Sequence, residues 1–201
     1  MQSIQTVGII GAGTMGNGIA QACATCGIDV VMVDINQAAV DRGLATVSGS
    51  LDRLIKKEKL TADQKTAALA RIKTSTEMRA LVGSQLVIEA ATENETLKVQ
   101  ILQQLDQLLP ADTLIASNTS SISITKLAAA TSRPSQFIGM HFFNPVPMMA
   151  LVEIIRGLQT SDATHDAVHA LAVALGKTPI TVKNAPGFVV NRILVPMINE
   201  A

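Results

Sequence analysis

Three glycines stand close together near the amino terminus, in Gly11-Ala12-Gly13-Thr14-Met15-Gly16. An apolar run typical of a buried strand, residues 4–10, precedes this loop, and a segment with helical character, residues 14–26, begins within it. An acid, Asp34, stands at the end of the next apolar run. A glycine loop between a strand and a helix, with an acid one strand later, is typical of a dinucleotide-binding βαβ unit.

The three glycines of this loop have different expected roles. Gly11 permits the tight turn, Gly13 lets the backbone approach a pyrophosphate, and Gly16 lets the helix pack closely on the sheet. The pyrophosphate would then meet the N–H groups at the helix amino terminus. Asp34 would accept hydrogen bonds from the adenosine ribose, and no arginine directly follows it to bind a 2′-phosphate. The sequence therefore predicts NAD(H) rather than NADP(H).

Three later segments contain residue types that suit proton transfer. Small hydroxyl side chains fill residues 117–121, directly after a predicted strand, although they could simply cap a helix. His141 ends another strand, where ligands of an open α/β sheet bind. Glu153 lies in an otherwise apolar strand and needs a partner, and only a turn separates that strand from His141. We expect the two to be neighbours, with Glu153 orienting the imidazole as a general base. A buried structural histidine is the alternative.

Six segments, taken in order, carry a family resemblance: GAGTMG, EAATENETLK, SNTSSI, HFFNPVPMM, LVEII and PGFVVNRIL. Together they resemble the L-3-hydroxyacyl-CoA dehydrogenase family, and within it the bacterial 3-hydroxybutyryl-CoA dehydrogenases. The resemblance runs from Val7 to the end of the chain. It implies an oxidoreductase of fatty-acid and butanoate metabolism that uses NAD and acts on a short acyl-CoA.

The resemblance also implies a role for each matching residue. His141 would be the general base and Glu153 its support, while Ser120 and Asn191 would hydrogen-bond the substrate near the reacting oxygen and the thioester. The cofactor would contact Gly11, Ala12, Gly13, Thr14, Met15, Gly16 and Asp34, with Glu93, Lys98, Ser120 and Asn144 beside its nicotinamide half. The CoA moiety would contact Ser50, Lys57 and Ser120.

Strand and helix patterns alternate along most of the chain. Further strands are expected at residues 28–33, 86–90, 113–116, 137–142, 151–155 and 179–182, and helices at 36–57, from 61, 95–109, 123–130, 162–175 and 188–201. This alternation predicts a Rossmann-like α/β fold, with a mainly parallel sheet and helices on both faces. We expect residues 1–184 to form the NAD-binding domain.

The last predicted helix, residues 188–201, carries an apolar stripe made of Ile193, Leu194, Met197 and Ile198. We interpret residues 185–201 as the first helix of an all-helical dimerisation domain whose remainder is absent. The family resemblance implies a homodimer for the full-length protein. A piece of this kind would bind NAD and turn substrate over poorly.

Composition excludes several classes of partner. The chain has 16 basic and 16 acidic residues, no Trp or Tyr and four Phe, so neither a nucleic-acid nor an acidic-lipid surface is expected. Neither a signal peptide nor a membrane span is recognisable, and we expect a cytoplasmic protein.

Three weaker signals favour structural roles. The pair Cys23 and Cys26 lies late in a predicted helix, where small apolar packing is expected. His165 and His169 have the helical spacing of zinc ligands, but no third ligand is evident, so we expect a solvated helix face and no metal. The basic run at residues 56–59 is by default a solvated helix end.

Two alternative functions remain open at this level. One is a sugar-acid dehydrogenase of related architecture, which would have no use for Ser50 and Lys57. The other is a non-catalytic dinucleotide-binding module.

Overall fold

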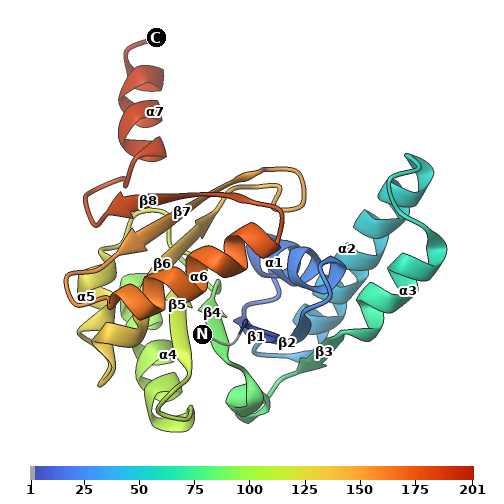
Figure 1. Cartoon of the computed structure of the whole chain (residues 1–201), viewed down its shortest axis with the longest axis horizontal. Coiled ribbons are helices and arrows are strands. Elements are labelled where there is room, and N and C mark those ends of the chain that lie inside the picture. Colours follow the sequence, from blue (N-terminus) through green and yellow to red (C-terminus); the bar gives the residue numbers. More distant parts are fainter. Residues whose placement is uncertain (1–2) are drawn as a thin grey trace.

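The computed structural model describes residues 3–201 and contains one sheet in the order β3-β2-β1-β4-β5-β6-β7-β8. Its strands are β1 (Thr6–Ile10), β2 (Asp29–Val33), β3 (Ile72–Ser75), β4 (Leu86–Glu89), β5 (Leu114–Ser117), β6 (Phe137–Phe142), β7 (Leu151–Arg156) and β8 (Thr178–Lys183). Every neighbouring pair is parallel except β6 and β7, which are antiparallel. The predicted mainly parallel α/β sheet is confirmed (Figure 1).

The sequence patterns missed one strand, β3. It pairs only with β2, at one edge of the sheet, and its four residues IKTS include a single strongly apolar side chain, Ile72. A half-exposed edge strand buries little, so it leaves almost no hydrophobic pattern in the sequence. The sheet therefore has one strand more than the seven that were predicted.

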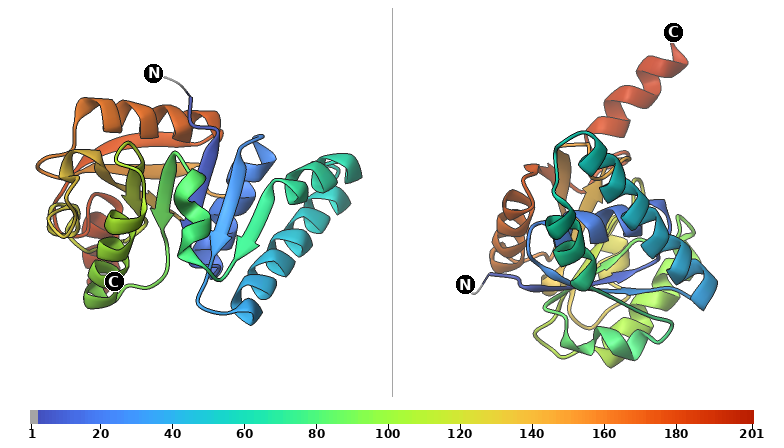
Figure 2. Two further views of the ribbon diagram at one scale, coloured as in Figure 1. Left: turned by 90° about the horizontal axis from the view of Figure 1, so that it is seen from below. Right: turned by 90° about the vertical axis from the view of Figure 1, so that its right-hand side faces the viewer.

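Helices cover both faces of the sheet (Figure 2). The helices are α1 (Thr14–Thr25), α2 (Gln37–Lys56), α3 (Ala62–Ala70), α4 (Glu95–Leu108), α5 (Ile124–Ala128), α6 (Asp162–Ala174) and α7 (Val190–Asn199), with short 3-10 helices η1 (Met78–Gly83) and η2 (Pro134–Gln136). One core layer combines buried side chains of α1, α2 and α6 with one face of the sheet. A second layer combines those of α4, α5 and η1 with the other face.

Side chains cap most of these helices at their amino termini. Asn36 accepts a hydrogen bond from the Ala39 N–H at the start of α2, and Asn94 and Ser161 do the same for α4 and α6. Thr61 begins α3 with a complete capping box. Such caps satisfy N–H groups that have no partner within the helix, and they explain why the helix starts could be predicted closely.

The last helix departs from the sequence prediction at its start. Phe188 was expected to begin the helix, but it adopts a left-handed conformation, φ +52°, and α7 begins at Val190. The helix projects away from the sheet (Figure 1). Its predicted apolar stripe is exposed, with Ile193 at 64%, Met197 at 60% and Ile198 at 61% of full exposure. Within residues 3–201, no helix is both long and apolar enough to cross a membrane.

Candidate active site

The glycine loop lies where the strand order of the sheet reverses, between β1 and β4. Ligands of open α/β sheets bind at the carboxyl ends of strands at such a point. Gly11 has φ +98°, and a Cβ built on it would lie 2.7 Å from the Ala90 carbonyl oxygen at the end of β4. The turn therefore requires a glycine for both its conformation and the close approach of the two strand ends.

The other two glycines differ in what surrounds them. A Cβ on Gly16 would lie 1.8 Å from the Gly11 carbonyl oxygen, whereas one on Gly13 would meet no atom of residues 3–201 within 4 Å. Gly16 is thus required by the fold itself. The free space at Gly13 and the absence of a side-chain cap on α1, among residues 3–201, suit a bound pyrophosphate.

Asp34 accepts hydrogen bonds from the Ala12 N–H and the Ile35 N–H, both at 2.7 Å. Its carboxylate joins the end of β2 to the glycine loop. Arg42 lines the same cavity of about 400 Å³, together with Gly13 and Asp34. No arginine directly follows Asp34 in the sequence, but Arg42 lies close to it in the fold. Arg42 lies eight positions along the chain, on the face of α2 that packs against the loop, and only helix periodicity could have indicated it.

A buried ion pair joins α4 to the end of β4. Lys98 is 2% exposed, and its Nζ is 2.8 and 2.7 Å from the two carboxylate oxygens of Glu89, which is fully buried. Glu89 also accepts from the Ser117 hydroxyl and the Ala91 N–H. The resemblance placed Lys98 beside the cofactor, but it did not identify Glu89, which reads in the sequence as one polar residue in an apolar strand.

Hydrogen bonds to other parts of the chain fix the hydroxyl-rich segment, residues 117–121, at the end of β5. Glu93 accepts hydrogen bonds from the Thr119 hydroxyl at 2.8 Å and the Ser120 N–H at 2.6 Å. The Asn118 side chain accepts from the Phe142 N–H at 2.9 Å, beside His141. The segment therefore fixes the backbone next to His141 as well as its own position. The N-cap of α5 is Ser123, which lies outside residues 117–121, so helix capping does not account for this segment.

His141 and Glu153 stand directly opposite each other in the antiparallel pair β6–β7. Opposite residues of such a pair project to the same face of the sheet. Nδ1 of His141 is 2.7 Å from Oε2 of Glu153, and the two residues are 6% and 0% exposed. The expectation that they are neighbours is confirmed. Since the buried carboxylate accepts a hydrogen bond, Nδ1 carries the proton and Nε2 carries the lone pair.

Residues around α7 close one side of this pair. The other oxygen of Glu153, Oε1, accepts hydrogen bonds from the Val189 and Val190 N–H groups at 3.0 and 2.9 Å. The Asn191 amide donates to the Ser120 carbonyl oxygen at 3.2 Å. The structure thus brings Ser120 and Asn191, which are distant in the sequence, to the hairpin that carries His141 and Glu153.

Ser50 and Lys57 are not part of this cluster. Ser50 lies within α2 and Lys57 is its exposed C-cap residue, so seven positions separate them on one face of the helix. Asn144, in the loop after β6, is exposed at the carboxyl edge of the sheet.

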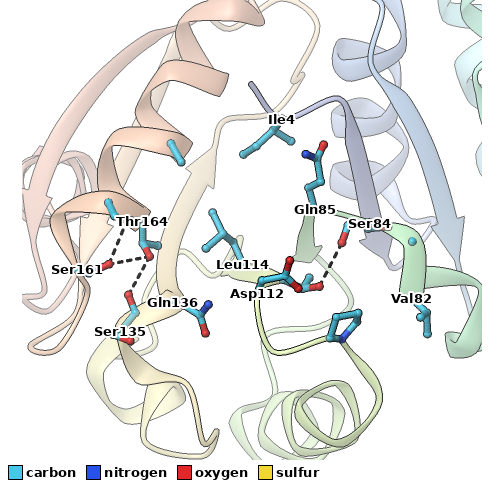
Figure 3. Close-up of a pocket in the computed structure, with 15 residues that line it drawn as sticks. Ile4, Val82, Ser84, Gln85, Asp112, Leu114, Ser135, Gln136, Ser161 and Thr164 are labelled. Atoms are coloured by element: carbon cyan, nitrogen blue, oxygen red, sulfur yellow. Dashed lines mark hydrogen bonds between the residues drawn. The ribbon is translucent and has the colours of Figure 1, made fainter. Parts of the chain in front are cut away.

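Another cavity lies at the opposite edge of the sheet. It measures about 660 Å³ and is lined by residues at the amino ends of β4, β5 and β6, among them Gln85, Leu114 and Gln136. Ser161 and Thr164 line this cavity (Figure 3). The Thr164 N–H donates to the Ser161 hydroxyl, and the Thr164 hydroxyl donates to the Ser135 carbonyl oxygen, so these polar groups are paired within the cavity wall. This cavity is therefore separate from the glycine loop and from His141.

The weaker sequence signals behave mostly as structural features. Burial raises the pKa of the Cys23 thiol to about 12, so Cys23 is an unreactive core residue. Cys26 is exposed at the end of α1 rather than packed, contrary to expectation. His165 is not simply solvated either, since it hydrogen-bonds Asp166 and Thr181. Residues 3–201 contain no cluster of three or more side chains able to hold a metal ion.

Comparison with known proteins gives the family. Residues 6–185 match the family model described as the NAD-binding domain of 3-hydroxyacyl-CoA dehydrogenase. The chain is 50% identical to a 3-hydroxybutyryl-CoA dehydrogenase of Bradyrhizobium diazoefficiens, over 98% of this chain and 68% of that protein. It is 52% identical to a probable 3-hydroxybutyryl-CoA dehydrogenase of Deinococcus radiodurans, over 96% of this chain and 69% of that one.

A solved structure is similarly close. The crystal structure of (S)-3-hydroxybutyryl-CoA dehydrogenase from Ralstonia eutropha is 72% identical and superimposes with a TM-score of 0.97, over 98% of this chain and 70% of that one. The glycine loop, with its free space at Gly13 and its uncapped helix, fits the cofactor that the family model names. The chain therefore belongs to the 3-hydroxyacyl-CoA dehydrogenase family and contains its NAD-binding domain.

Proposed function

We propose that this protein oxidises a short-chain 3-hydroxyacyl-CoA to the 3-ketoacyl-CoA with NAD⁺, or catalyses the reverse reduction, with His141 as general acid–base. One observation carries the proposal: a buried His141–Glu153 pair at the carboxyl edge of the sheet that holds the glycine loop. The names of the relatives support the substrate class.

NAD⁺, when bound, supplies the acceptor for the hydride that leaves C3 of the substrate. His141 Nε2 accepts the proton of the 3-hydroxyl, so one C–H and one O–H bond break as the C3 carbonyl forms. Glu153 keeps the proton on Nδ1 and faces the imidazolium that forms, at 2.7 Å. In the reverse direction the same imidazolium returns its proton to the oxygen.

The surrounding polar residues have positioning and binding roles in this proposal. Ser120 and Asn191, joined by a hydrogen bond, bind the substrate beside the reacting oxygen and the thioester. Glu93 and Asn144 are exposed at the same edge and contact the nicotinamide half of the cofactor. Lys98 is buried on Glu89, and we propose that it acts there chiefly by holding Glu89 and, at 4.0 Å, Glu93 in place.

Ser50 and Lys57 are proposed to bind the CoA moiety, because the last turn of α2 is basic and suits a phosphate. Lys57→Ala should raise the KM for acetoacetyl-CoA with little change in kcat, measured by the loss of NADH absorbance. Lys73→Ala, an exposed lysine on β3, is the matched control. An unchanged KM in Lys57→Ala would favour a sugar-acid substrate over a CoA thioester.

We also propose that the NAD-binding domain comprises residues 1–184, and that residues 185–201 open a helical domain that forms a homodimer. The end of the family match at residue 185 and the exposed apolar face of α7 support this division. If α7 is a separate unit here, its amides should exchange hydrogen faster than those of α6. Equal protection of the two helices would contradict it.

The exposed face of α7 also suggests that the 201 residues bind NAD(H) better than they catalyse. We expect NADH to bind in a fluorescence titration, and its oxidation with acetoacetyl-CoA to be slow. A turnover rate equal to that of the longer relatives would refute this part of the proposal, and an absence of any activity with intact NADH binding would favour a non-catalytic module.

A further inference from the structure

The connection between β8 and α7 contains two consecutive residues in the left-handed conformation, Gly187 at φ +72° and Phe188 at φ +52°. Gly187 adopts this conformation without steric cost, but for a bulky residue such as Phe188 the conformation is strained. Phe188 is nevertheless only 2% exposed. Contacts of the phenylalanine side chain must therefore offset that strain.

The ring of Phe188 forms part of the wall around His141. Their ring centroids are 5.9 Å apart and the rings are tilted by 58°. Phe143 lies against the same imidazole, with centroids 4.5 Å apart. Two phenyl rings therefore restrict the imidazole, in addition to its hydrogen bond with Glu153. The Phe188 ring also belongs to the core layer that contains α4 and α5.

The backbone of the same segment binds Glu153. The two N–H groups that follow Phe188, those of Val189 and Val190, donate to Oε1 of Glu153 at 3.0 and 2.9 Å. Val189 is the N-cap residue of α7, and its apolar side chain cannot accept a capping hydrogen bond. Glu153, on the neighbouring strand β7, caps the helix instead. The dipole at the helix amino terminus favours the negative charge of its carboxylate. One oxygen of Glu153 thus holds α7 and the other holds His141.

We propose that Phe188 is a positioning residue for the His141–Glu153 pair. Its left-handed backbone directs the next two N–H groups at Glu153, and its ring limits the orientation of His141. The inference rests on the proposed function, in which His141 transfers the proton. It assigns to the connecting segment the task of keeping that base aligned, without contact with substrate or cofactor.

Two substitutions separate the contribution of the ring from that of the backbone. Phe188→Gly removes the ring but is compatible with φ +52°, so the N–H groups can stay on Glu153. Gly187→Ala keeps the ring, but its Cβ would lie 2.9 Å from the Arg192 backbone nitrogen and φ +72° disfavours it. We expect each to lower kcat about 10- to 100-fold, with little change in the Kd for NADH. Phe188→Gly should also leave the KM for acetoacetyl-CoA nearly unchanged.

The matched control is Phe137→Leu, since Phe137 is a fully buried phenylalanine at the other end of β6. It should lower the thermal midpoint while leaving kcat unchanged at permissive temperature. A second readout, independent of turnover, is the NMR resonance of the proton on Nδ1 of His141. It should be sharp and downfield in the parent and in Phe137→Leu, and broadened or lost in Phe188→Gly and Gly187→Ala.

Parent-like kcat and an intact Nδ1 proton in Phe188→Gly would overturn the assignment to Phe188. An equal loss of kcat in Phe137→Leu would also overturn it, since the effect would then be general loosening. If His141→Gln turned over as fast as the parent, the proposed function would fail instead, and the NMR readout would still report whether the segment holds the pair.

Discussion

The glycine loop and the His141–Glu153 pair lie at the same edge of one sheet but are built in opposite ways. At the loop, no side chain of residues 3–201 caps α1, Gly13 faces free space and the cavity beside Asp34 measures about 400 Å³. At the pair, Glu153 is completely buried and both of its oxygens accept hydrogen bonds. The glycine loop leaves N–H donors that a ligand can satisfy. In the His141–Glu153 pair, the carboxylate oxygens and Nδ1 are already hydrogen-bonded and held in place.

This difference separates binding from alignment. A region that leaves donors free gains its energy when a ligand arrives. A region with no free donors holds a reactive group in one orientation before the ligand arrives, which is what proton transfer needs. Substitutions in the two regions should therefore affect different measured quantities.

The largest expected effect is that of His141→Gln. Loss of a general base should lower kcat about 10²–10⁴-fold, while the Kd for NADH measured by fluorescence titration stays the same. Glutamine keeps a polar side chain of similar size, so the stability of the domain should change little. A parallel loss of NADH binding would show that His141 is structural, and would remove the contrast between the two regions.

Next in size is the effect of Gly16→Ala on stability. The added Cβ would lie 1.8 Å from the Gly11 carbonyl oxygen, so the loop or α1 must move, and we expect the free energy of unfolding to fall by about 1–3 kcal/mol. Urea denaturation measures this change.

Gly13→Ala is the control for that experiment. Its Cβ would meet no atom of the described part of the chain within 4 Å and its φ of −65° suits alanine, so unfolding should be unaffected while NADH affinity falls. Unchanged NADH affinity in Gly13→Ala would contradict the close approach of the cofactor to this loop.

A smaller effect should distinguish the roles of Asp34 and Arg42. Asp34→Asn keeps an oxygen for the Ala12 N–H but removes the charge that opposes a 2′-phosphate. NADH binding should weaken by about 1–2 kcal/mol, and NADPH binding should become measurable because Arg42 lines the same cavity. Addition of Arg42→Ala should abolish the NADPH binding. If NADPH binding persists in the double variant, another group must provide the positive charge.

The smallest effect concerns the pair Asp106 and Arg133, which lies outside both regions and serves as a reference for them. Burial would raise the pKa of Asp106, but hydrogen bonds from Ser132 and Arg133 outweigh burial and lower it. A lowered folded-state pKa stabilises the protein above the unfolded value, about pH 4, and that contribution disappears as pH falls through the folded value. Asp106→Asn should therefore cost about 1 kcal/mol near neutral pH and nothing at the acid limit. A cost that is independent of pH would refute this origin.

Most of the fold follows from local patterns in the sequence. Apolar runs predict the buried strands, and capping residues such as Asn36 and Thr61 predict helix starts within one or two positions. The misses occur where local pattern and tertiary contact disagree. Strand β3 is too exposed to leave a pattern, and Phe188 reads as helical although Glu153 fixes the start of α7 two residues later.

The sequence by itself determined the cofactor half, because glycine loop, helix and Asp34 lie within one continuous βαβ unit whose geometry is local. It also indicated His141 and Glu153, since the turn between their strands makes them opposite neighbours. Only the tertiary structure decided what surrounds them. Glu89 and Phe188 acquire their roles from segments that meet in space, and neither residue type nor spacing along the chain records those meetings.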